Sequence, residues 1–160
     1  MLESFFPGVQ HLQNIHPLVV HFPIAFLNGA VLLYFLALIL RSERLSFSAF
    51  VLLILGTLSL GAAAGTGLYA EEGVMVSRSV RANLLDLHER LMLTALGFSV
   101  LLSLWGVIRR PFPKKGRSLF LILLVGLLIV IAKGADYGGR MVYDYNAGGS
   151  ACGQPIEFEK

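Results

Sequence analysis

The chain has 160 residues, of which 56% are hydrophobic and only 14% are charged, and its mean hydropathy is +0.72. Soluble domains have about 25% charged residues, and a chain this short has too little interior to bury so much apolar surface. The bilayer must therefore be the solvent for most of it. The net charge of +3 does not indicate nucleic-acid binding, because the basic residues lie between apolar runs and form no groove-like patch with interleaved aromatics.

Four long apolar segments follow a short leader. Residues 1–16 contain no Lys or Arg and so lack the basic region of a cleaved signal peptide. Each later segment is about as long as the roughly 20 residues that a membrane-spanning helix needs. We expect helices at about 17–40, 47–68, 84–108 and 119–135. The fold class predicted is an all-α, four-transmembrane-helix bundle, a single domain over residues 1–160 with a polar tail at 136–160.

Prolines and glycines modify two of these helices. Pro17 suits the first helical position, and Pro23, a turn deeper, should kink the helix or loosen its first turn. The second helix ends in GAAAGTG, in which Gly61 and Gly65 have GxxxG spacing. Small residues of this kind favour close helix packing in a membrane. Room for a flat cofactor is the other interpretation.

The distribution of basic residues predicts the orientation. The connections 41–46 and 109–117 hold seven of the thirteen Lys and Arg residues and a single acid, Glu43. Connections rich in Lys and Arg stay in the cytoplasm. Both termini are therefore expected outside, on the periplasmic side of a bacterial inner membrane.

This topology places all four histidines at the outer face. His11 and His16 belong to the leader, His21 lies about one turn inside the first helix, and His88 begins the apolar part of the third. At 100° per residue, His16 and His21 are about 140° apart on a helix, so one helix cannot easily aim both at a single metal. Asn28 lies seven residues after His21 and shares its face.

Two facing helices, each with one histidine above small residues, suit a planar ligand. Neutral imidazole is the usual axial ligand of b-type haem. We expect His21 and His88 to be the axial ligands, with His16 as a substitute or a supporting partner, and Asn28 beside the cofactor. The simpler alternative is that each histidine hydrogen-bonds a loop carbonyl.

Other chemistries have weaker patterns. Three histidines with Glu71, Glu72 or Asp136 could form a tetrahedral zinc site, but no HxxxH or HExxH spacing supports it. No GxSxG motif or Ser-His-Asp arrangement indicates hydrolysis. Cys152 is the only cysteine, so neither covalent haem attachment through CxxCH nor an internal disulfide is possible.

The tail contains a glycine pair that could reverse the chain. Gly138 and Gly139 permit the positive φ angles of a sharp turn. We expect the fourth helix to end near Ala135 and the segment MVYDY to fold over the outer face, bringing Tyr143 or Tyr145 close to a histidine or ligand. Arg140 could then bind a haem propionate or a lipid phosphate. A solvated tail is the alternative.

The run IHPLVVHFPIAF, residues 15–26, resembles the signature of a bacterial membrane family known as domain of unknown function 2231, and GGRMVY, residues 138–143, extends the resemblance. The resemblance implies four helices over nearly the whole chain and candidate functional positions at His16, His21 and His88. Some relatives are fused to Rieske iron–sulfur or c-type cytochrome domains, which implies electron transfer. Relatives often have a histidine where this chain has Tyr145, so a second haem at that place is not expected.

These patterns lead to three functional hypotheses. The first is an inner-membrane electron-transfer subunit that binds one haem b near the periplasmic face and relays electrons between quinol, or a partner subunit, and a periplasmic carrier. The second is a cofactor-free accessory subunit of a larger respiratory complex, packed through its glycine faces. The third is a protein that handles small molecules or ions with its histidine cluster. All three describe a membrane subunit rather than a stand-alone enzyme.

Reporter fusions test the predicted orientation. A reporter that is active only in the cytoplasm should be active when fused after Arg41 or Lys114, because the basic connections stay inside. The same reporter should be silent when fused after Lys160. An active fusion at Lys160 would reverse the orientation.

Overall fold

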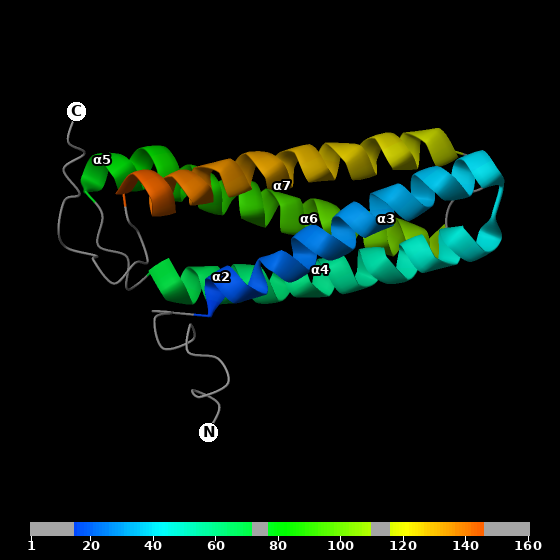
Figure 1. Ribbon diagram of the computed structural model, residues 1–160, viewed down its shortest axis with the longest axis horizontal. Helices are drawn as coiled ribbons and strands as arrows, with labels where there is room; N and C mark the ends of the chain where they lie inside the picture. The colour runs from blue at the N-terminus through cyan, green and yellow to red at the C-terminus, as the bar shows by residue number, and fades with distance from the viewer. Residues whose placement is uncertain (1–14, 72–76, 110–115, 146–160) are drawn as a thin grey trace, which may run out of the picture.

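The computed structural model describes residues 15–71, 77–109 and 116–145, and these residues form helices without any strand (Figure 1). Four helical spans among them are long and apolar enough to cross a membrane. The spans are His16–Leu40, Glu43–Glu71, Arg78–Arg109 and Arg117–Tyr145. The predicted all-α bundle of four transmembrane helices is therefore confirmed.

Two of the spans are interrupted near the same end of the molecule. The elements in chain order are α2 (His16–Val19), α3 (His21–Leu40), α4 (Glu43–Glu71), α5 (Arg78–Val80), the π-helical turn η2 (Arg81–Leu85), α6 (Asp86–Arg109) and α7 (Arg117–Tyr145). The break between α2 and α3 falls at Val20, and Pro23 explains it, since proline has no N–H to donate to the carbonyl of Val19.

The fourth helix is longer than predicted. It continues past Ala135 to Tyr145, so the predicted helix end and the chain reversal at Gly138 and Gly139 are wrong. Only Gly116 has a positive φ among the glycines that the structure describes. The outer turns of α7 have a packing partner that the sequence did not reveal, because Met141 is buried in a small cluster with residues of α5 and η2. A helix that can bury its apolar face continues.

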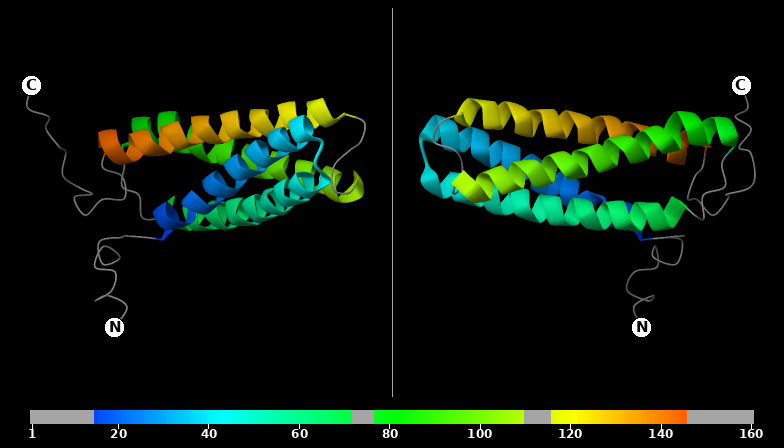
Figure 2. Two further views of the ribbon diagram at one scale, coloured as in Figure 1. Left: turned by 45° about the vertical axis from the view of Figure 1, so that its right-hand side comes forward. Right: turned by 180° about the vertical axis from the view of Figure 1, so that it is seen from behind.

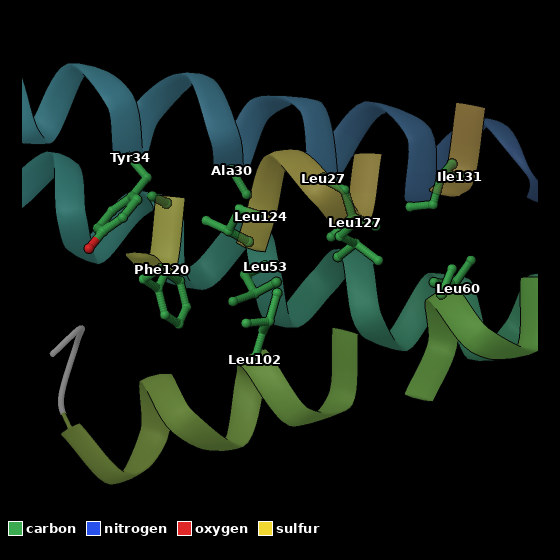
Figure 3. Packing of buried hydrophobic residues seen from close by; sticks show 12 residues of the cluster. Leu27, Ala30, Tyr34, Leu53, Leu60, Leu102, Phe120, Leu124, Leu127 and Ile131 are labelled. Atoms are coloured by element: carbon green, nitrogen blue, oxygen red, sulfur yellow. The ribbon is translucent and has the colours of Figure 1, made fainter. Parts of the chain in front are cut away.

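The four spans form two hairpins, α2–α3–α4 and α5–η2–α6–α7. The hairpins pack tightly at the end where α3 turns into α4 (Figure 3). There the ring of Phe120 makes edge contacts with Tyr34 and Trp105, at centroid distances of 5.4 and 5.3 Å. The Tyr34 hydroxyl donates to the backbone carbonyl of Arg117 at 3.4 Å, and the Arg117 guanidinium pairs with Glu43 at 3.2 Å. This end of the bundle is closed.

The two hairpins bury equivalent positions. The buried residues of α4 reappear in α7 at a constant offset of 71 residues, and most of those of α3 reappear in α6 at an offset of 72. The α4 and α7 pairs are Ala49 and Phe120, Leu53 and Leu124, Gly56 and Leu127, Leu60 and Ile131, and Ala63 and Gly134. The α3 and α6 pairs are Pro23 and Ala95, Leu27 and Ser99, Ala30 and Leu102, and Tyr34 and Gly106.

The contacts between the hairpins follow the same equivalence. Helix α3 corresponds to α6, and α4 corresponds to α7. The contact of α4 with α6 therefore corresponds to the contact of α7 with α3, and both are present. A pseudo-twofold axis along the bundle therefore relates the two halves of the chain.

Matched alanine substitutions test the packing of the closed core. A Cβ on Gly56 would lie 2.5 Å from Cδ2 and 2.6 Å from Cγ of the buried Leu27, whereas a Cβ on Gly126 would meet nothing within 4 Å. We expect Gly56→Ala to lower the free energy of unfolding in mixed micelles by about 1–3 kcal/mol through overpacking. Gly126→Ala should leave it unchanged or raise it slightly. Equal stability of the two variants would contradict this packing.

Candidate functional site

The two hairpins diverge toward the end opposite the closed core, where the end of α4 and the end of α7 lie apart (Figure 2). A cavity of about 400 Å³ lies between them, a volume typical of small-molecule and cofactor sites. Its lining is largely apolar, with contributions from both hairpins. The polar side chains in the lining are His16, His21, His88, Glu71, Glu89 and Tyr143.

His16 forms part of the wall that the first hairpin provides. Its ring lies against Gly67 of α4, where a Cβ would be only 3.0 Å from Cε1 and 3.3 Å from Nδ1. Nδ1 is 3.2 Å from the hydroxyl oxygen of Thr66, and the backbone of Ala63 also accepts a hydrogen bond from the imidazole. A Cβ at position 67 would therefore require the ring to shift by a few tenths of an ångström.

His88 forms the corresponding part of the opposite wall. Its Nδ1 donates to the backbone carbonyl of Gly134 in α7 at 2.7 Å. The ring lies against Gly138, where a Cβ would be 3.0 Å from Cε1 and 3.2 Å from Nδ1. The π-helical turn η2 ends three residues before His88, and π-helical turns inside α-helices are frequent at functional sites.

The two histidines occupy equivalent places in the two halves. Each ring lies on a glycine of the following helix and hydrogen-bonds the backbone of the small residue one turn earlier, Ala63 for Gly67 and Gly134 for Gly138. The glycines are 71 residues apart and the histidines 72, the same offsets that relate the buried positions. His16 and His88 thus lie on opposite walls of the cavity.

The hydrogen bonds determine which ring nitrogen can act as a ligand. A carbonyl oxygen only accepts, so Nδ1 of His88 must carry the proton, and Nε2 of the neutral ring then carries the lone pair. The corresponding partner of Nδ1 in His16 is the hydroxyl oxygen of Thr66. A metal-bound histidine generally makes this kind of hydrogen bond with its other nitrogen. Across the described residues, no three His, Cys, Asp or Glu side chains cluster as a metal site would need.

The sequence-predicted site residues divide into two groups. His16, His21, His88 and Tyr143 all line the cavity, although His21 and Tyr143 are exposed. Asn28 is exposed, does not line the cavity and donates to the carbonyl of Ile24 at 2.7 Å.

Arg140 and Tyr145 lie at a second, smaller pocket of about 120 Å³, and Arg140 pairs with Asp144 at 3.6 Å. The structure therefore does not bring Asn28, Arg140 or Tyr145 to the cavity that holds the histidines. His11, Glu72 and Cys152 lie outside the described residues.

The sequence interpretation did not single out Thr66 or Gly134, and it treated Gly67 only as part of a run of small residues that favours helix packing. A signal was present in the sequence. Ala63 and Gly67 form a small-xxx-Gly pair near the end of one helix, and Gly134 and Gly138 form another near the end of the next hairpin.

The fold and the cavity define a small polytopic membrane protein, made of two equivalent hairpins that enclose a pair of half-buried histidines. The model of the family described as predicted membrane protein (DUF2231) matches residues 12–151, so the chain belongs to this family. This match confirms the resemblance that the HPLVVHFP run indicated. Neither the curated proteins nor the solved structures include a significant match.

Alanine substitutions at two adjacent glycines test whether the contact of the His88 ring with Gly138, here called the glycine seat of the histidine, contributes to stability. Gly138→Ala should push the ring away and weaken its bond to the carbonyl of Gly134, at a cost of about 0.5–1.5 kcal/mol in the free energy of unfolding. Gly139→Ala is the control, because a Cβ there would come no closer than 4.0 Å to another side chain. If both variants unfold alike, the contact between His88 and Gly138 does not contribute to stability.

Proposed function

We propose that the chain is an inner-membrane electron-transfer subunit that binds one b-type haem between His16 and His88. It would relay electrons between quinol, or a membrane partner, and a periplasmic carrier. One observation carries the proposal. Two equivalent imidazoles, both hydrogen-bonded to the helix behind them, line opposite walls of an apolar cavity.

The residues present fit the requirements of such a group. Bis-histidine ligation needs one imidazole from each side of the ring, with Nε2 as the lone-pair nitrogen. A flat macrocycle also needs small residues along the walls, and Ala64 of the first hairpin and Ala135 and Gly139 of the second line the cavity. Ala64 and Ala135 are again 71 residues apart. Each wall therefore provides an alanine at this matched position.

In this proposal His16 takes the place that the sequence suggested for His21. The ring of His16 has a glycine seat and two hydrogen-bond partners, whereas His21 is exposed at the rim of the cavity. A ligand whose ring plane is fixed before binding loses less side-chain entropy when it binds.

The chain would supply binding, orientation and a dry environment. A bound haem provides the one-electron chemistry, while the protein sets its ligation and surroundings. Leu60, Met92 and Ile131 line the cavity and limit water. The ion pair between Arg81 of η2 and Glu71, a cavity-lining residue at the end of α4, joins the two hairpins. This link would hold the two walls at a fixed separation.

The position of the site in the membrane follows from the charge pattern. The cavity lies at the end of the bundle away from the basic connections, so the positive-inside rule puts it at the periplasmic face. A periplasmic electron carrier could then approach it, and a quinol could approach from the bilayer.

Purified protein tests the proposal directly. After expression with added haem precursor, or after reconstitution with haem, we expect a Soret band that shifts on reduction and the spectrum of a six-coordinate, bis-histidine centre. His16→Ala and His88→Ala should each lose that spectrum, because each removes one axial ligand.

His21→Ala is the matched control, since it removes a third histidine from the same cavity, and it should keep the spectrum. Wild-type protein that stays colourless after reconstitution would overturn the proposal and favour the accessory-subunit or ion-handling hypotheses. Unchanged spectra in both the His16 and His88 variants would overturn the choice of ligands.

A further inference from the structure

We infer that Thr66 is a positioning residue that fixes the ring orientation and the tautomer of His16. His16 depends on such a side-chain hydrogen bond more than His88 does. The role of Thr66 toward the histidine stands on the structure alone. Its effect on a bound haem rests on the proposed function.

The hydroxyl of Thr66 lies closer to two carbonyl oxygens than to His16. Oγ1 is 3.0 Å from the carbonyl oxygen of Ala62 and 3.1 Å from that of Ala63, and it has a single proton to donate. Helical threonines commonly donate to such carbonyls one turn earlier. With the proton donated in this way, a lone pair of Oγ1 faces Nδ1 of His16, at 3.2 Å. This acceptor then selects a proton on Nδ1, and Nε2 is left with the lone pair.

Only one of the two equivalent walls has this hydroxyl. The residue that matches Thr66, 71 positions later, is Tyr137. Tyr137 packs instead against the small cluster around Met141, and the ammonium group of Lys133 lies 5.2 Å from its ring centroid. Nδ1 of His88 donates to a backbone carbonyl and not to a side chain. Thr66 therefore breaks the symmetry of the site.

The position of His16 in the backbone explains why its side chain needs a further hydrogen bond to fix its orientation. His16 begins the four-residue helix α2, which buries none of its residues and is separated from α3 at Val20. His88 lies ten residues inside its span, Arg78–Arg109, whereas His16 is the first residue of its own span. A side chain on a short, exposed turn receives little orientation from its own backbone, because such turns open easily. The hydroxyl of α4 supplies that orientation from the neighbouring helix.

Two measurements test the inference with three variants. Thr66→Val keeps the shape of the side chain but removes the acceptor, and Thr66→Ser restores a hydroxyl. Thr57→Val is the matched control. It makes the same change nine residues earlier on α4, where the hydroxyl donates to Leu53 at 2.9 Å and contacts Ser103 at 2.9 Å in the closed core.

The first measurement is the ¹⁵N NMR spectrum of histidine-labelled, haem-free protein in detergent. In the wild type and in Thr57→Val, the His16 nitrogens should show a single Nδ1–H form. In Thr66→Val a population of the Nε2–H form should appear, and Thr66→Ser should remove it. If the His16 signals of Thr66→Val match those of the wild type, the inference is wrong, whether or not the protein binds haem.

The second measurement is haem affinity by competition with apomyoglobin. Loss of a residue that orients a metal ligand typically lowers affinity 10- to 100-fold, so Thr66→Val should fall in that range. Thr66→Ser and Thr57→Val should remain close to the wild type. An altered tautomer with no binding by the wild type would refute the proposed function alone. An altered tautomer with unchanged affinity would refute the effect of Thr66 on the haem.

Discussion

The seating of an imidazole on a glycine of the neighbouring helix is the contact on which the open end of the bundle depends. A ring nitrogen packed against a helix is shielded from water, so the protein must supply its hydrogen-bond partner. A helix can do so because each backbone carbonyl keeps a second lone pair, but side chains normally cover it. Gly138 exposes the carbonyl of Gly134 in this way, and the ring of His88 fills the space. The absence of one Cβ thus creates both the seat and the hydrogen bond.

The contact between a histidine ring and a glycine occurs once on each wall, so the two walls of the cavity are chemically similar. Because His16 and His88 sit on opposite walls related by a pseudo-twofold axis, a group between them meets similar chemistry from both sides. The closed core at the other end, with Tyr34 and Phe120, keeps the hairpins together without filling the gap. Packing and ligand binding are thereby separated along the length of the bundle. The closed end provides stability, and the open end provides space.

The sequence predicted the class of fold and the location of the histidines, because hydropathy and charge are properties of whole segments. It did not predict the length of α7, since a glycine pair signals a turn only when no partner buries the helix around it, and Met141 has such a partner. The choice between His16 and His21 also depended on tertiary structure. The 140° separation assumed one continuous helix, whereas Pro23 interrupts it and the seat for His16 lies on another helix at Gly67.

The sequence alone also does not reveal that the two halves of the chain are equivalent. The matched positions share burial but seldom residue type, as Leu27 and Ser99 or Tyr34 and Gly106 illustrate. A bilayer core accepts any side chain that fills the space, so the pattern of burial persists where identity does not. Gly67 and Gly138 are the exception, because a Cβ at either position would lie 3.0 Å from Cε1 of the histidine ring.

Each histidine and its seat belong to the same hairpin, and this has a consequence for the order of assembly. Gly67 follows His16 before the second hairpin begins, and Gly138 follows His88 within the second hairpin. A polytopic chain enters the membrane from its N-terminal end as it is synthesised, and its units can fold in that order. Each wall of the cavity is therefore complete once its own hairpin has inserted. The cavity itself comes into existence only when the second hairpin docks on the first.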